Sequence, residues 1–360
     1  MPRPQPLSVL ISDSARARWD AAIEQRVQAI LQASTQNPHA SAADYVEPEV
    51  QWVSPQSVPD AAGHYPCQVA YITRDVTGAS TKTRVLQDLQ RFYEVMRASP
   101  HLAWVHVHSA GADRPIFSEL RQRGIKVSTS SGANAQPVAH TALGAVLALG
   151  RRFADLWAAQ QAGRWAPLVG RPDVHDLTGQ TAMVVGMGRI GAEIARMLQA
   201  IGMQVVGVTR SELSGRSELS SRSAPSPEVC TYADMAAHLH RVHYLILACP
   251  LSPLTHQLVN TQVLRGLPQG ACVVNVARGE VVDQAALIQA LQSGHLGGAF
   301  LDVFETEPLD AASALWRLPN VIISPHTAGH FAEHADRVQR LFLDNLGRFL
   351  SDTPLHNEYL

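Results

Sequence analysis

The stretch Thr181–Gly191, TAMVVGMGRIG, decides how this chain folds. Its apolar first half, residues 182–185, predicts a buried β-strand, and glycines at 186, 188 and 191 follow where that strand ends. Downstream, apolar residues recur at the spacing of one helical face: Ile190, Ile194, Leu198 and Ile201. A second apolar run, residues 204–208, then predicts the next strand. Strand, glycine turn, helix and strand in this order predict a βαβ unit of a parallel sheet.

The three glycines have separate physical roles in such a unit. Gly186 allows the tight turn, Gly188 lets the backbone approach a pyrophosphate, and Gly191 lets the helix pack closely on the sheet. The first helical amides, those of Arg189 and Ile190, offer donors to phosphate where the helix dipole favours negative charge. The sequence therefore predicts a dinucleotide-binding site at this turn.

The end of the second strand bears on which dinucleotide binds. NAD sites normally have an acidic residue there, which accepts hydrogen bonds from the ribose hydroxyls. This chain instead has Thr209, Arg210 and Ser211, so no carboxylate repels a 2′-phosphate and the guanidinium can bind one. The alternative is that Arg210 is a solvated loop residue. We expect NADP(H) to be preferred, with NAD(H) possible.

The rest of the chain predicts an α/β protein with two domains. Its 360 residues exceed the usual size of one domain, and a hydrophobic fraction of 46% suffices for two cores. Short apolar runs in the first third alternate with helical patterns: residues 8–12, 68–73, 104–108 and 125–128. Six further strand-like runs follow from residue 182. The prediction is two Rossmann-like domains with doubly wound parallel sheets.

Bulk properties exclude several classes of function. A net charge of −2 argues against a nucleic-acid binder, and no segment approaches the ~18 apolar residues of a membrane span. The N-terminus shows no signal-peptide pattern. The four cysteines lie far apart, without the spacing of a metal site, which fits a reducing cytoplasm. The Ser/Arg-rich residues 211–227 predict a mobile loop.

Several motifs, in order along the chain, resemble the D-isomer-specific 2-hydroxyacid dehydrogenase family. They are WVHVHSAGAD (104–113), VVGMGRIG (184–191), ACPLSPLTHQLVN (248–260), VVNVARGEVVD (273–283), GAFLDVFETEPL (298–309) and NVIISPHTAG (320–329). The Ala-Cys-Pro-Leu form and the Thr-Arg-Ser strand end are most similar to its glyoxylate/hydroxypyruvate reductase branch, which favours NADPH. Before residue 104 the resemblance is one of architecture only.

The resemblance implies a cofactor domain inserted into a flavodoxin-like substrate domain. Residues 1–140, completed by 331–360, correspond to the substrate (catalytic) domain, and residues 141–330 to the dinucleotide-binding domain. This arrangement explains why the glycine motif begins only halfway along the chain. A homodimer is the family expectation.

The resemblance also implies a catalytic trio of Arg278, Glu307 and His326, each where a predicted strand ends. A planar guanidinium suits the carboxylate and carbonyl of a 2-keto acid, so Arg278 is assigned to substrate binding as well. An imidazole can deliver the proton to the carbonyl oxygen, and a neighbouring carboxylate stabilises its charged form. Glu305 is the alternative acid, but Glu307 holds the motif position before Pro308.

Further contacts are implied by the same motifs. The backbone amides of Ser109, Ala110 and Gly111 match the loop that binds the substrate carboxylate. Asp302 matches a residue near the nicotinamide carboxamide, although a buried structural role competes. The remaining cofactor contacts implied are Cys249, Pro250, Val276, Ala277 and Gly329. No metal ligands are expected.

Four other polar residues receive no role. Arg74 follows a predicted strand and can add specificity or lie on the surface. His106 and His108 alternate along a strand and so face one side of the sheet. His140 stands where the family commonly has a glutamate, which leaves that helix contact in doubt.

We therefore expect a cytoplasmic oxidoreductase that reduces a small 2-keto acid, of the glyoxylate or hydroxypyruvate kind, to the D-2-hydroxy acid. One alternative is a same-fold dehydrogenase of another small acid. A formate-dehydrogenase-like activity is disfavoured because that family has a glutamine in place of the acidic partner. The alternative from another class is a nucleotide-sensing corepressor, which would bind the nucleotide without turnover; Thr209 and Arg210 argue against its cofactor, NAD(H).

Overall fold

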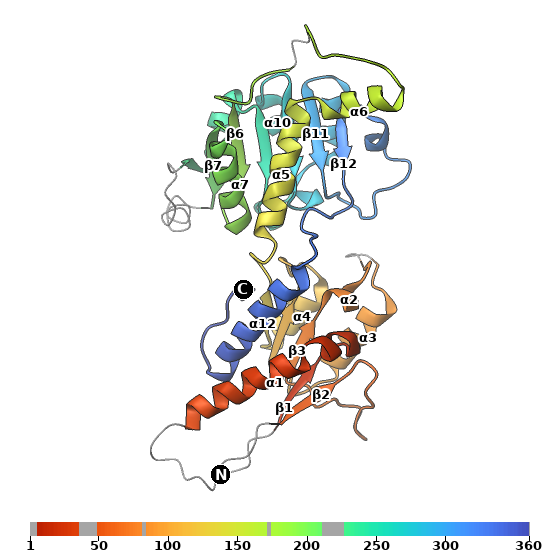
Figure 1. Ribbon diagram of the computed structural model, residues 1–360, viewed down its shortest axis with the longest axis vertical. Helices are drawn as coiled ribbons and strands as arrows, with labels where there is room; N and C mark the ends of the chain where they lie inside the picture. The colour runs from red at the N-terminus through yellow and green to blue at the C-terminus, as the bar shows by residue number, and fades with distance from the viewer. Residues whose placement is uncertain (1–5, 36–48, 81–83, 171–173, 211–226, 360) are drawn as a thin grey trace. The chain divides into compact units, whose positions relative to one another are not determined.

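The computed structural model describes residues 6–35, 49–80, 84–170, 174–210 and 227–359, which form two compact units (Figure 1). The first unit is Met1–Ala133 with Ala332–Leu360, and the second is Asn134–Phe331. The predicted domain borders, 140/141 and 330/331, remain predictions, and the first of them falls inside helix α5 (Ala135–Gly150). Residues 211–226 of the predicted mobile loop lie outside the described residues.

The first unit contains a five-stranded, all-parallel sheet in the order β2-β1-β3-β4-β5. This is the strand order of flavodoxin-like folds. The strands are β1 (Leu7–Leu10), β2 (Val50–Val53), β3 (Val69–Ile72), β4 (Trp104–Val107) and β5 (Lys126–Thr129). The sequence did not predict β2, because this edge strand is only half buried and lacks a continuous apolar run.

Helices cover both faces of this sheet (Figure 1). They are α1 (Asp13–Thr35), α2 (Arg74–Thr77), α3 (Gln87–Arg97), α4 (Pro115–Gln122) and the last helix of the chain, α12 (His334–Leu350). Helix α12 packs in this unit: its buried Phe342 stacks on Tyr71 of β3, with ring centroids 4.1 Å apart, and on Trp104 of β4.

The second unit contains a seven-stranded parallel sheet in the order β12-β11-β10-β9-β6-β7-β8. The order reverses at β6, as in a dinucleotide-binding fold. The strands are β6 (Thr181–Val185), β7 (Gln204–Thr209), β8 (Glu228–Thr231), β9 (Tyr244–Leu247), β10 (Ala271–Asn275), β11 (Leu296–Leu301) and β12 (Val321–Ile323). Six of these were predicted; the exception is β8, a short edge strand with a single buried side chain.

Two hydrophobic cores, one on each face, hold the helices against this second sheet. Together with α5, the helices are α6 (Phe153–Gln161), α7 (Arg189–Ala200), α9 (Met235–His238), α10 (Thr261–Gly266) and α11 (Gln284–Gln292), with short 3-10 turns η2 (Leu239–Arg241), η3 (Gly279–Val281) and η4 (Ala314–Arg317). Within the described ranges, none of the chain's helices has the length and apolarity needed to cross a bilayer.

Candidate active site

The glycine turn between β6 and α7 has a close-packed side and an open side. A Cβ at Gly191 would overlap the carbonyl oxygen of Gly186, and a Cβ at Gly186 would overlap the backbone of Cys249. A Cβ at Gly188, the N-cap of α7, would meet no described atom within 4 Å. The protein's own packing therefore explains Gly186 and Gly191, whereas Gly188 leaves exposed space at a helix N-terminus, where a pyrophosphate fits.

The residues that the sequence implies for the ribose end of the cofactor, 209–211, lie where β7 ends. Thr209 is buried as the last residue of the strand, and Arg210 is exposed directly after it; Ser211 lies outside the described residues. Burial and the neighbouring Cys249 raise the pKa of Tyr232, and the charge of Arg210 acts on this tyrosine in the opposite direction. The side chain of Arg210 is therefore exposed to solvent, outside the hydrophobic core and near Tyr232.

Arg278 lies in the turn after β10, where Asn275 fixes the backbone. The buried Asn275 side chain accepts a hydrogen bond from the Ala277 amide and donates one to the Arg278 carbonyl, both at 3.0 Å. Val276 and Ala277 are buried in this turn, and Arg278 Nη1 donates to the Ala277 carbonyl at 2.7 Å. The turn presents the guanidinium at the carboxyl edge of the sheet.

Glu307 and His326 contact each other although 19 residues separate them. Nδ1 of His326 lies 2.8 Å from Oε2 of Glu307, and Oε1 of Glu307 accepts a hydrogen bond from the Phe304 amide at 3.1 Å. Burial raises the pKa of Glu307, but the hydrogen bond and charge of His326 outweigh it, so this pKa lies below its usual value. Arg278 lowers it further through its charge. An ionised Glu307 is the result.

Asp302, at the end of β11, holds the loop that carries His326. Its buried carboxylate accepts hydrogen bonds from the amides of Thr327 and Ala328 and from the Ser324 hydroxyl, and its carbonyl accepts from the His326 amide at 2.7 Å. These bonds hold His326 in the left-handed region, at φ 52°, which histidine tolerates better than most residues. The competing structural role expected for Asp302 is thus the one its geometry supports.

The alternative acid, Glu305, has a different task. Its Oε1 accepts the Gln284 amide at 3.0 Å, in the first turn of α11, where Asp283 also caps the helix. Glu305 therefore satisfies a helix N-terminus, while Glu307 alone of the two contacts His326.

The lowered pKa of Glu307 makes its contact with His326 pH-dependent. Because the folded pKa lies below the unfolded one, the contact stabilises the fold above the unfolded pKa of ~4.3. That contribution is lost as pH falls through the folded pKa. In urea titrations, the free energy of unfolding of Glu307→Gln should be lower than that of the wild type above about pH 5, and the two should converge in more acidic solution. A difference that is constant down to pH 2 would contradict this.

The loop expected to bind the substrate carboxylate comes after β4 in the first unit. The Ser109 hydroxyl donates to the Gly111 carbonyl at 2.6 Å, and the Ser109 carbonyl accepts the Ser130 amide. The amides of Ser109, Ala110 and Gly111 donate to no residue among those the structure describes. These half-exposed donors can bind an anion, as the sequence predicts.

Three of the four unassigned residues also lie in the first unit. His106 is a core residue: its ring nitrogens pair with the hydroxyls of Ser128 and Ser130, and burial lowers its pKa to about 3. His108 and Arg74 line a cavity of the first unit. His140, on α5 in the second unit, is exposed.

Sequence reasoning missed the residues that hold the site in shape, namely Asn275, the Phe304 amide and Ser324. The asparagine of the NVARG motif was the available signal, because a buried asparagine beside a turn usually bonds the backbone. Gly329, expected at the cofactor, packs closely: a Cβ there would overlap Asn134 Nδ2. Pro250 is exposed after β9, and its carbonyl accepts the Thr255 hydroxyl.

Comparison with known proteins identifies the family of this chain. Residues 143–328 match the model of the D-isomer specific 2-hydroxyacid dehydrogenase NAD-binding domain. A glyoxylate reductase of Korarchaeum cryptofilum is 32% identical over 71% of this chain and 75% of its own length. A 2-ketogluconate reductase of Gluconobacter oxydans is 32% identical over 73% of this chain and 80% of its own. A Xanthobacter autotrophicus family member in complex with NADPH and MES superposes with a TM-score of 0.69, at 25% identity, covering 99% of this chain and 98% of the other. The chain belongs to the D-isomer specific 2-hydroxyacid dehydrogenase family.

Proposed function

We propose that the protein is an NADPH-preferring reductase that converts small 2-keto acids, of the glyoxylate or hydroxypyruvate kind, to D-2-hydroxy acids. The observation that carries the proposal is the Glu307–His326 contact, on loops that come after β11 and β12. Because the strands are parallel, these loops share one sheet edge with the Arg278 turn and the glycine turn. The names of the two curated relatives support a 2-keto acid as substrate.

In the proposed reaction, each of these residues has a separate role. The open face of Gly188 and the N-terminus of α7 would hold the pyrophosphate of NADPH, which would supply the hydride when bound. Arg278 binds the keto acid and polarises its carbonyl, and the amides of residues 109–111 bind its carboxylate. His326 donates a proton to the carbonyl oxygen, which gains negative charge as C2 is reduced. Ionised Glu307 orients the imidazole and stabilises its charged form.

The preference for NADPH depends on Arg210. Replacing it with alanine should raise KM for NADPH about tenfold, the loss of one charge-assisted hydrogen bond to phosphate, and change KM for NADH less than twofold. Steady-state kinetics with both nucleotides at saturating glyoxylate measure this. The partly exposed Arg241, which pairs with Glu228 on β8, offers a control of the same charge in Arg241→Ala. Equal effects of Arg210→Ala on the two nucleotides would place this arginine outside the phosphate site.

The activity itself is tested by the loss of NADPH absorbance with glyoxylate and with hydroxypyruvate. Turnover, with the D-enantiomer as product in chiral chromatography, supports the reductase. Nucleotide binding without turnover of any 2-keto acid would instead indicate the corepressor-like sensor.

We also propose a homodimer in a reducing, cytoplasmic setting. Large apolar side chains are exposed along α6 and the segment after it, including Trp157 at 54% and Trp165 at 97%. Such patches commonly mark contacts between chains. All four cysteines are free thiols, which suits a reducing compartment. Light scattering of the purified protein tests the dimer, and a monomer at micromolar concentration would refute it.

A further inference from the structure

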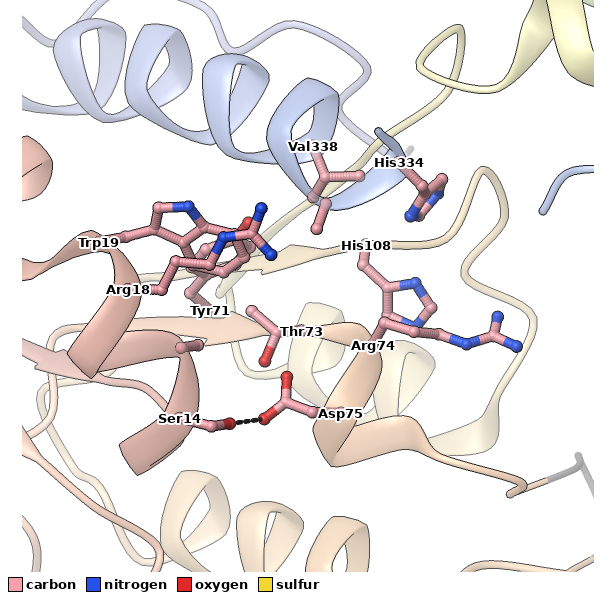
Figure 2. A pocket seen from close by; sticks show the side chains of 12 residues that line it. Ser14, Arg18, Trp19, Tyr71, Thr73, Arg74, Asp75, His108, His334 and Val338 are labelled. Carbon is pink, nitrogen blue, oxygen red and sulfur yellow. Dashed lines mark hydrogen bonds between the residues drawn. The ribbon is translucent and has the colours of Figure 1, made fainter. Parts of the chain in front are cut away.

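The first unit contains a half-open cavity of about 280 Å³, whose lining combines apolar side chains such as Trp19 and Val338 with polar ones (Figure 2). Its walls come from the start of α1, the end of β3, α2, the end of β4 and the start of α12. Parallel strands place β3 and β4 so that their carboxyl ends meet here, the edge at which open α/β sheets bind ligands. The cavity lies wholly within this unit.

Two buried polar atoms in the walls have no partner among the described residues. The Tyr71 hydroxyl and Nδ1 of His108 are inaccessible to solvent and make no hydrogen bond there, although their side chains are 0% and 5% exposed. Nε2 of His108 bonds the Thr77 hydroxyl at 2.9 Å, and burial lowers the pKa of this histidine to about 3, so its ring is neutral. Buried polar atoms are normally paired, so these two indicate a polar ligand.

Asp75 gives the cavity its charge. Its carboxylate accepts hydrogen bonds from the hydroxyls of Ser12 and Ser14, each at 2.6 Å. Burial raises the pKa of Asp75, but these bonds outweigh it and hold the pKa below its usual value. An ionised carboxylate in the wall repels an anionic group and accepts hydrogen bonds from hydroxyl groups.

The nearby cations do not cancel this preference. Arg18 is neutralised by Asp336, 2.6 Å away on α12. The side chain of Arg74 makes no hydrogen bond or ion pair within the described ranges, and its guanidinium points past His108 and away from Asp75 (Figure 2). Of the residues that the structure describes, the walls therefore offer hydroxyl-bonding groups and no free cation aimed inward.

Arg18 is a displaceable cover over Tyr71. In Figure 2 its guanidinium lies beside the Tyr71 ring, and its charge acts on the Tyr71 hydroxyl. The side chains of Arg18 and Asp336 are 54% and 50% exposed, so their ion pair contributes little to stability. A ligand hydroxyl can move this cover aside and reach the buried oxygen at small cost.

The volume indicates how large the ligand is. At ~30 Å³ per water, 280 Å³ corresponds to about nine waters. Glyoxylate has no carbon beyond its carbonyl and would leave this space unused. A chain of four hydroxylated carbons, eight carbon and oxygen atoms, has room in it.

We propose that this cavity binds the hydroxylated chain of a sugar-acid substrate, a 2-keto acid with several hydroxyl groups beyond its carbonyl. The inference rests on the proposed function and narrows its substrate class. His108, in the wall, directly precedes Ser109, so the cavity adjoins the loop proposed for the substrate carboxylate. Hydroxyl groups of the chain donate to Asp75 and accept from Tyr71.

A series of substrates distinguishes a cavity for a hydroxylated tail from one for an apolar tail or an anionic tail. The wild type is assayed with NADPH and with 2-ketogluconate, 2-ketohexanoate, 2-ketoglutarate or glyoxylate, which differ in having a hydroxylated, an apolar, an anionic or no tail. We expect kcat/KM for 2-ketogluconate to exceed that for 2-ketohexanoate and for 2-ketoglutarate at least tenfold. Turnover of glyoxylate with equal or better use of 2-ketohexanoate or 2-ketoglutarate overturns the inference and leaves the reductase standing.

A pair of variants tests the cavity directly. Tyr71→Phe should lower the ratio of kcat/KM for 2-ketogluconate over glyoxylate about five- to tenfold, the loss of one hydrogen bond. Tyr93→Phe is the matched control, because Tyr93 is also a buried tyrosine, but it lies on α3 outside the cavity. Equal ratios in the two variants overturn the inference.

A binding measurement decides the inference even without turnover. Calorimetric titration of D-gluconate into the NADPH-loaded protein should give saturable binding that Tyr71→Phe weakens and Tyr93→Phe does not. No binding to the wild type, or equal binding to both variants, overturns the inference. Failure of every 2-keto acid to react, with gluconate still bound in this pattern, overturns the reductase but retains the cavity's assignment.

Discussion

His326→Ala should lower kcat for 2-keto acid reduction about 10³-fold while the Kd for NADPH changes less than twofold. The reason is that general acid catalysis by a positioned group contributes roughly 10²- to 10⁴-fold. His326 is half exposed, on a loop whose shape Asp302 holds through main-chain amides, so removing the imidazole leaves the loop and the glycine turn intact. Stopped-flow or steady-state kinetics give kcat, and fluorescence titration gives the NADPH affinity.

A nearby histidine offers the control for this experiment. His330 lies four residues further on, is exposed, and bonds the Thr327 hydroxyl through Nδ1. His330→Ala removes an imidazole of the same loop without touching Glu307, and its kcat should stay within twofold of the wild type. A normal kcat in His326→Ala, or an equal loss in both variants, would remove His326 from the proton-transfer step.

Periodicity and turn chemistry explain why so much of the fold could be predicted. Strands buried on both faces, such as β6 and β9, are continuous apolar runs, and the glycine spacing identifies the turn and helix after β6. The two strands that were missed, β2 and β8, are edge strands. Their half-exposed residues leave no run or alternation to detect, since an edge strand depends on its neighbour's hydrogen bonds as much as on its own side chains.

The residues of the candidate site also differ in how far the sequence could predict them. Arg278, Glu307 and His326 could be located because each falls in a motif at a strand end. Asn275 and the Phe304 amide, which hold these residues in place, were missed because they act through main-chain hydrogen bonds. The cavity beside Asp75 was beyond sequence reasoning for another reason: α1 and α12, about 300 residues apart, both line it.

The glycine turn itself yields a second large effect, one that separates binding from folding. Gly188→Val should raise the Kd for NADPH roughly 100-fold and leave the free energy of unfolding of the apo protein nearly unchanged. Its backbone, at φ −72° and ψ −167°, is extended and open to any residue, and no described atom lies within 4 Å of the added Cβ. The added Cβ meets no described atom of the protein, so we expect the new side chain to overlap chiefly with a bound pyrophosphate, at a cost of about 3 kcal/mol.

Gly191→Ala is the contrasting variant, because its Cβ would overlap the Gly186 carbonyl oxygen inside the packed turn. Its backbone oxygen partner cannot move without shifting β6, so this change should lower the urea midpoint of the apo protein and weaken NADPH binding together. Gly188→Ala, with a smaller group, should fall between wild type and Gly188→Val in Kd alone. Normal NADPH binding by Gly188→Val would show that the phosphates do not lie at this face of the turn. Unfolding of its apo form would contradict the open space beside Gly188.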